Sequence, residues 1–248
     1  MAMTGDGVND VIALRQSDCG IAMQSGSDAA RHVSRIVLLT SDFAVLPKIV
    51  AEGRRSINNL QRSASLFLVK TIFAALTALI FIFMRAKYPL APIQFTLIST
   101  LTIGFPSFVL ALQKNSERVR GKFLNKVLLT ALPGALTDVL ITLLLATIGA
   151  KISGPEAIST LVTVSLGYVG LLFLFRLCLP PTTIRIALFA VCTGAFAFAV
   201  LVFRKFFELV PIAGEVLLIL LLSFAAATIS FAVLTYICNK VQRKYMNE

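Results

Sequence analysis

The pattern of apolar and polar positions divides the 248-residue chain into a mixed first quarter and a strongly apolar remainder. Six apolar stretches follow, at roughly 66–84, 93–112, 127–149, 158–179, 185–203 and 216–238. A transmembrane helix needs about 20 mostly apolar residues, and each stretch has that length and ends at a charge, a proline or a glycine. The pattern predicts a mainly α, polytopic membrane protein with a six-helix transmembrane domain over 66–248. The second stretch is the least regular, because Gly104 and Pro106 interrupt it.

Residues 1–55 show a different, α/β pattern. Apolar periodicity predicts a helix near 8–16, and short apolar runs predict strands at 19–23 and 36–39. Ser27 and Asp28 can cap a second helix. Residues 42–65 are expected to form a helix that runs into the first span without a break. Such a helix could transmit a signal as a stalk, or it could be a plain connector.

Composition and charge agree with a membrane protein. The chain is 57% hydrophobic and 14% charged, whereas a soluble domain carries about 25% charged residues. Lys and Arg are unevenly divided between alternate loops, and the positive-inside rule assigns the richer set to the cytoplasm. The richer set has thirteen members: Arg54, Arg55, Arg62, Lys114, Arg118, Arg120, Lys122, Lys126, Arg176, Arg185, Lys240, Arg243 and Lys244. The other set has five: Arg85, Lys87, Lys151, Arg204 and Lys205. Both termini are therefore expected in the cytoplasm.

The net charge of +11 does not indicate a nucleic-acid partner. The basic residues lie at helix ends and in short loops, where topology and anionic lipids explain them. The cysteines, Cys19, Cys178, Cys192 and Cys238, have no metal-ligand spacing, and the single histidine is His32. We expect membrane lipids as partners and no nucleic acid.

The clearest candidate for a functional site is the string GDGVND at residues 5–10, which concentrates glycines, carboxylates and an amide in six positions. Its glycines permit tight turns and close approach to a ligand, and carboxylate and amide oxygens suit magnesium, which commonly accompanies phosphate. A plain Gly/Asp/Asn turn is the alternative. The density of the string favours a magnesium and phosphate site ahead of a helix.

This string resembles the hinge motif of P-type cation-transporting ATPases. The resemblance continues in order through residues 17–23, 25–30, 35–39, 42–43 and 52–55 to Asn58 and Asn59. It implies that residues 1–55 are part of a haloacid-dehalogenase-like phosphorylation domain and that 42–65 is a stalk helix. It also implies magnesium ligands at Asp6 and Asp10, phosphate-positioning roles for Asn9 and Asp10, and a cofactor site that includes Thr4, Gly5 and Gly7.

The same resemblance implies ATP hydrolysis coupled to transport of calcium or another inorganic cation. The sequence has no Asp-Lys-Thr-Gly-Thr segment, which carries the phosphorylated aspartate in that family. We therefore expect a C-terminal fragment, inactive alone, whose missing N-terminal portion binds ATP. The alternatives are a non-catalytic membrane partner, a degenerate remnant or a passive six-span channel. The expected location is a bacterial plasma membrane.

Polar groups inside the spans mark a candidate ion pathway, because they are costly in a bilayer. The first span carries Lys70 and Thr71, and the second carries Ser99 and Thr102 next to the interruption at Gly104 and Pro106. A break there could free carbonyl oxygens for a cation, whereas hydroxyls could simply bond back to their own helix. Asp138 in the third span completes the candidates.

The second span also differs from the calcium pumps that it resembles. Thr102-Ile103-Gly104-Phe105-Pro106 is similar to their Thr-Asp-Gly-Leu-Pro, with Ile103 in place of the ligand aspartate. Thr71 and Ala74 fall where a ligand asparagine and glutamate would stand. Lys70 could replace the charge of a bound ion or move a proton, or it could extend to the cytoplasmic headgroups.

Overall fold

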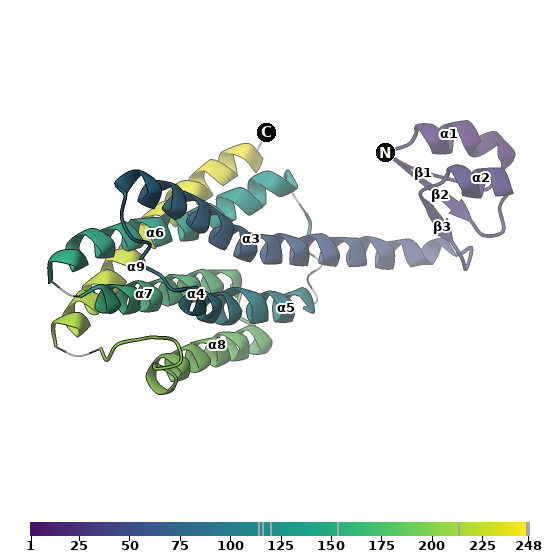
Figure 1. Ribbon diagram of the computed structural model, residues 1–248. Coiled ribbons are helices and arrows are strands. Elements are labelled where there is room, and N and C mark those ends of the chain that lie inside the picture. The colour runs from purple at the N-terminus through teal and green to yellow at the C-terminus, as the bar shows by residue number, and fades with distance from the viewer. Residues whose placement is uncertain (114, 116, 120, 153, 213, 247–248) are drawn as a thin grey trace. The chain divides into compact units, whose positions relative to one another are not determined.

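The computed structural model describes residues 1–113, 115, 117–119, 121–152, 154–212 and 214–246 (Figure 1). The chain forms two compact units, Met1–Arg54 and Arg55–Glu248, each with its own core. Lys114 and Arg120, two of the charges counted above for topology, lie outside the described residues.

The first unit contains a three-stranded parallel sheet. Its strands are β1 (Ala2–Gly5), β2 (Cys19–Met23) and β3 (Ile36–Leu38), in the order β1-β2-β3. Helix α1 (Val11–Gln16) connects the first two strands, and α2 (Asp28–Val33) connects the second and third. Leu14, Ala22 and Ala30 form a small core between helices and sheet. The two predicted helices and the two predicted strands, β2 and β3, are confirmed in their order, whereas β1 was not predicted. The cap at Ser27 is also confirmed, since its Oγ accepts from Ala30 N at 3.2 Å.

A short 3₁₀ helix, Phe43–Val45, precedes the longest helix of the chain. Asp42 caps it, with Oδ1 accepting from Ala44 N at 2.8 Å. Helix α3 then runs over Leu46–Met84, so the predicted connector and the first span belong to one helix.

The second unit is helical in its described part. After α3 come α4 (Pro92–Ser99), a π-helical segment (Thr100–Gly104), α5 (Phe105–Ala111), α6 (Phe123–Ile152), α7 (Pro155–Leu177), α8 (Thr183–Val202) and α9 (Glu215–Met246). Six helical spans among the described residues are long and apolar enough to cross a membrane, as predicted. The second is continuous but irregular, because a π-helical segment ends two residues before Pro106.

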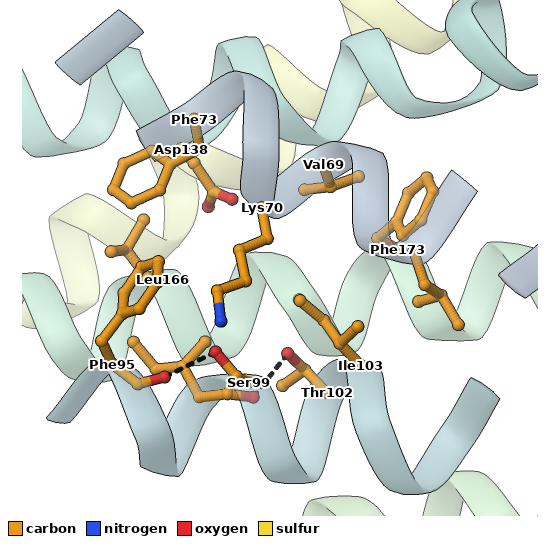
Figure 2. Close-up of a pocket in the computed structure, with 13 residues that line it drawn as sticks. Val69, Lys70, Phe73, Phe95, Ser99, Thr102, Ile103, Asp138, Leu166 and Phe173 are labelled. Atoms are coloured by element: carbon orange, nitrogen blue, oxygen red, sulfur yellow. Dashed lines mark hydrogen bonds between the residues drawn. The ribbon is translucent and has the colours of Figure 1, made fainter. Parts of the chain in front are cut away.

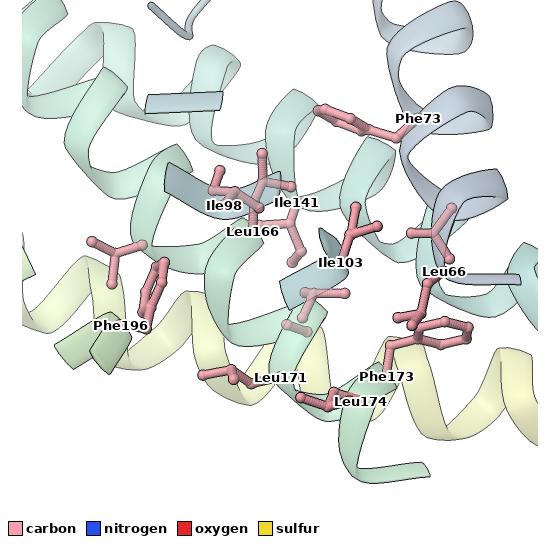
Figure 3. Close-up of a cluster of buried hydrophobic side chains, with 14 of the residues drawn as sticks. Leu66, Phe73, Ile98, Ile103, Ile141, Leu166, Leu171, Phe173, Leu174 and Phe196 are labelled. Atoms are coloured by element: carbon pink, nitrogen blue, oxygen red, sulfur yellow. The ribbon is translucent and has the colours of Figure 1, made fainter. Parts of the chain in front are cut away.

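Helix α7 lies at the centre of the second unit. In its most apolar window 67% of the residues are buried within the protein, against 17% for α9, whose outer face carries exposed leucines and isoleucines. Figure 3 shows Phe173 and Leu174 of α7 among buried side chains from several other helices. A buried central helix and apolar outer faces are the pattern expected of a bundle surrounded by lipid.

Two glycines allow neighbouring elements to approach α7 closely. A Cβ at Gly167 would lie 1.9 Å from Phe196 Cζ of α8, and a Cβ at Gly170 would lie 2.8 Å from the Thr102 side chain. Small residues at helix contacts are typical of membrane bundles. Both positions therefore require glycine.

Candidate functional site

The GDGVND loop lies at the carboxyl end of β1. Gly5 ends the strand, and Val8–Asp10 form a 3₁₀ turn that leads into α1. Oδ2 of Asp10 accepts hydrogen bonds from the backbone nitrogens of Asp6 and Gly7, both at 3.1 Å. Asp10 therefore folds the loop around its own carboxylate.

The glycines of this region serve close packing. A Cβ at Gly5 would lie 2.5 Å from Cβ of Asp10, and one at Gly26 would lie 2.8 Å from the Asp6 carbonyl oxygen. That oxygen also accepts from Ser27 N at 2.7 Å. The turn after β2 thus holds the backbone of Asp6, a contact that the sequence did not predict.

The donor set of the loop fits a partial magnesium site. The Asp6 side chain is exposed, and in the described part of the chain no hydrogen bond engages its carboxylate. Asp10 has a second oxygen, while Asn9 is exposed and Thr4 belongs to β1. Magnesium commonly takes one or two carboxylates and completes its octahedron with phosphate and water. No group of three or more His, Cys, Asp or Glu side chains suited to a metal occurs among the described residues.

The second candidate site is a cavity of about 30 Å³ inside the helical unit. Its walls come from α3, from α4 with the π-helical segment, from α6 and from α7 (Figure 2). Four of the predicted pathway residues line it together: Lys70, Ser99, Thr102 and Asp138. A space of this size has room for about one or two water molecules.

Lys70 and Asp138 are the ionisable groups that line this cavity. Asp138 is 6% exposed, and its Oδ1 has no hydrogen-bond partner. Nζ of Lys70 lies 4.6 Å from the centre of the Phe95 ring, a cation–π contact. Among the described residues no ion pair within 4.0 Å joins the two side chains. The cavity therefore contains one acidic and one basic side chain that do not pair with each other.

The direction of the Lys70 side chain bears on its role. Its Nζ contacts Phe95, which lies near the start of α4. If the side chain extended towards the beginning of the first span, it would lie beside the end of α5 instead. Figure 2 shows the side chain extending towards Ser99 and Thr102. The ammonium group of Lys70 therefore lies in the cavity.

Several hydroxyls of the second span bond back to their own helix. Ser99 Oγ donates to Phe95 O at 2.7 Å, Thr102 Oγ1 to Ile98 O at 2.8 Å and Ser107 Oγ to Gly104 O at 2.9 Å. Because each hydroxyl donates its proton to a carbonyl of its own helix, its oxygen lone pairs remain available to accept a hydrogen bond or to bind a cation. At Ser99 and Thr102 these acceptors line the cavity.

Three predicted pathway residues lie elsewhere. Thr71 is on an exposed face of α3 and donates to Phe67 O at 3.1 Å. Neither Gly104 nor Pro106 lines the cavity. Gly104 ends the π-helical segment that carries Thr102, and Pro106 belongs to α5. Phe95 and Gly170 line it and were not predicted. Only the small size of Gly170, three residues after Gly167, could have indicated a close contact.

Fold and sites define a polytopic membrane protein that has an ionisable intramembrane cavity and a small α/β unit with an acidic glycine-rich loop. No protein-family model matches the chain. It is 44% identical over 204 residues to the probable cation-transporting ATPase exp7 of Streptococcus pneumoniae, covering 79% of this chain and 26% of that protein. It is 47% identical over 146 residues to the calcium-transporting ATPase CtpE of Mycolicibacterium smegmatis, covering 55% of this chain and 18% of that protein.

A calcium-transporting ATPase of Bacillus subtilis is 33% identical over 115 residues, 46% of this chain and 13% of its own length. The chain thus spans about a quarter or less of each of these relatives. They confirm the family relationship predicted from the GDGVND string. The chain is related to the P-type cation-transporting ATPases and corresponds to a C-terminal region of such proteins.

Proposed function

We propose that the chain forms the ion-translocating membrane region of an ATP-driven cation pump, together with part of its phosphorylation domain. The names of the relatives and the six spans support this proposal. The observation that carries it is the cavity, which the buried carboxyl group of Asp138 lines together with Lys70 and the hydroxyls of Ser99 and Thr102. Buried ionisable groups inside a membrane bundle commonly mark a transport path.

Asp138 would provide the negative charge of the site. A cation entering the cavity would meet this carboxylate and the oxygens of Ser99 and Thr102, and it would be repelled by the Lys70 ammonium. Occupation of the site therefore requires the ammonium to move away or lose its proton. The transported species would be calcium or another inorganic cation, with Lys70 restricting how much positive charge the site accepts.

In the first unit, Asp6 and the free oxygen of Asp10 would hold magnesium. When bound, magnesium neutralises charge on a transferred phosphoryl group. Asn9 would orient the phosphate, and Thr4, Gly5 and Gly7 would line the same site. The aspartate that accepts the phosphoryl group and the residues that bind ATP would come from sequence other than these 248 residues.

The test is a pump in which this chain replaces the matched residues of the S. pneumoniae relative. ATP-driven uptake of calcium, manganese, potassium and protons is measured in inverted membrane vesicles. Asp138→Asn should lower uptake at least tenfold, because a neutral amide attracts a cation far less than a carboxylate does. Lys70→Met should change the ion preference or the number of charges moved per ATP.

Thr137→Val is the matched control. Thr137 is also fully buried in α6 and donates to Pro133 O at 2.7 Å, but it does not line the cavity. Its uptake should stay within about twofold of the parent. The proposal fails if Asp138→Asn transports normally, or if a folded, inserted chimera carries no cation that stimulates its ATP hydrolysis.

A further inference from the structure

A second hollow, of about 200 Å³, lies in the helical unit and plays no part in the proposed transport site. It forms where α3 meets the segment after α5, the first turn of α6 and the end of α7. Its charged or amide-bearing lining residues include Gln61, Arg62, Glu117, Lys126 and Arg176. It is several times larger than the cavity of about 30 Å³ beside Lys70.

The charges that line this hollow are unbalanced. Arg62, Lys126 and Arg176 are cationic and Glu117 is anionic. Within the described part of the chain, no ion pair within 4.0 Å joins Glu117 to any of the three. Like charges gathered in a partly buried space repel one another, so an anion in the hollow would stabilise the arrangement.

Two residues that line the hollow also carry buried donors without an acceptor. Gln61 is 5% exposed, and its Nε2 has no hydrogen-bond partner. Nη1 of Arg62, the next residue, is likewise buried and unpartnered. Buried N–H groups are nearly always paired in folded proteins, so these two indicate a missing acceptor.

Hydrogen bonds connect the elements that form the walls of the hollow. Nη2 of Arg176 donates to Asn239 Oδ1 at 2.8 Å, which fixes the guanidinium at the edge of the hollow. Nδ2 of Asn58 donates to Glu117 O at 2.9 Å, and Nδ2 of Asn59 donates to Ala111 O and Gln113 O, both at 2.8 Å. These amides fasten the segment after α5 to α3. The walls of the hollow are therefore joined to one another by side-chain hydrogen bonds.

We propose that this hollow binds a phosphate-bearing anion. Phosphate offers several acceptor oxygens and negative charge, which match the three cationic side chains that line the hollow. The side chains lie at the ends of the spans that the loop charges assign to the cytoplasm. The headgroup of an anionic lipid or a free phosphate could supply this chemistry.

Two exposed cations on the same segment provide a matched comparison. Arg118 and Lys122 are close in sequence to the hollow but do not line it. If the basic residues served only general attraction to the membrane, all of these positions would contribute equally. A specific site requires a larger effect from Arg62 and Lys126.

The test uses the whole 248-residue chain, purified in detergent and stripped of lipid. Inorganic phosphate, short-chain phosphatidylglycerol and short-chain phosphatidylcholine are titrated separately, and binding is followed by calorimetry and by thermal stabilisation. Arg62→Gln and Lys126→Gln should each weaken binding about fivefold, the amount expected for one basic residue near an anionic surface. Arg118→Gln and Lys122→Gln should leave the affinity unchanged.

Binding of phosphatidylglycerol alone would support the site and identify a lipid headgroup as its source. Competition between phosphate and phosphatidylglycerol would support it and show that the phosphate group suffices. Equal weakening by all four variants, or no binding of either anion, would overturn the proposal. Lys126 is only half-buried, so Lys126→Gln keeps the test decisive if Arg62→Gln does not fold.

Discussion

At the scale of single residues, Gly5 determines whether the acidic loop can close. A methyl group at this position would lie 2.5 Å from Cβ of Asp10, whose carboxylate accepts from Asp6 N and Gly7 N. Gly5→Ala should therefore displace Asp10 and destabilise the first unit by about 1–3 kcal/mol. Hydrogen exchange measured by mass spectrometry should show faster exchange of the Asp6 and Gly7 amides.

Gly53→Ala is the control for this change. Gly53 lies inside α3, and a Cβ there would meet no atom within 4 Å. Alanine should stabilise that helix by about 0.5–1 kcal/mol, because glycine loses more backbone freedom on folding. Unchanged amide exchange in Gly5→Ala would contradict the role assigned to Asp10.

At the scale of elements, the contact between α7 and α8 depends on Gly167. Phe196 is 5% exposed, and its Cζ would lie 1.9 Å from a Cβ at Gly167, so the ring has little room to move away. Gly167→Ala should lower the stability of the helical unit by about 1–3 kcal/mol. Thermal unfolding in detergent, followed by circular dichroism, measures this loss.

Two further variants separate packing from the general effect of adding a methyl group. Gly194→Ala changes a glycine of α8 where an added methyl group would meet no atom within 4 Å, and this variant should unfold at the parental temperature or above. Phe196→Leu combined with Gly167→Ala should recover part of the lost stability, since the smaller side chain leaves room for the methyl group. Equal melting of Gly167→Ala and the parent would rule out this account.

At the scale of the whole molecule, the sequence predicted what depends on local pattern. Apolar length was enough to locate six spans, and the turn residues and short apolar runs were enough to order the helices and the last two strands of the first unit. The first strand, Ala2–Gly5, was not predicted. The proximity of Lys70 to Asp138 could not be predicted, because it depends on how the first and third spans pack. The π-helical segment could not be predicted either, because Pro106 indicated only that the helix is irregular. The packing of Thr102 against Gly170 depends on how the second span meets α7.

The orientation of the six spans leads to the last prediction. An even number of crossings places both termini on one side of the membrane, and the unequal loop charges assign that side to the cytoplasm.

In a variant without native cysteines, Lys205→Cys, in the loop before α9, should react with a membrane-impermeant maleimide in intact cells. Lys122→Cys, in the segment before α6, should react only after permeabilisation. Both positions are exposed, so their difference in labelling would report the side of the membrane and not burial. Labelling of Lys122→Cys in intact cells would reverse the orientation, and with it the assignment of the phosphate-binding hollow to the cytoplasmic ends of the spans.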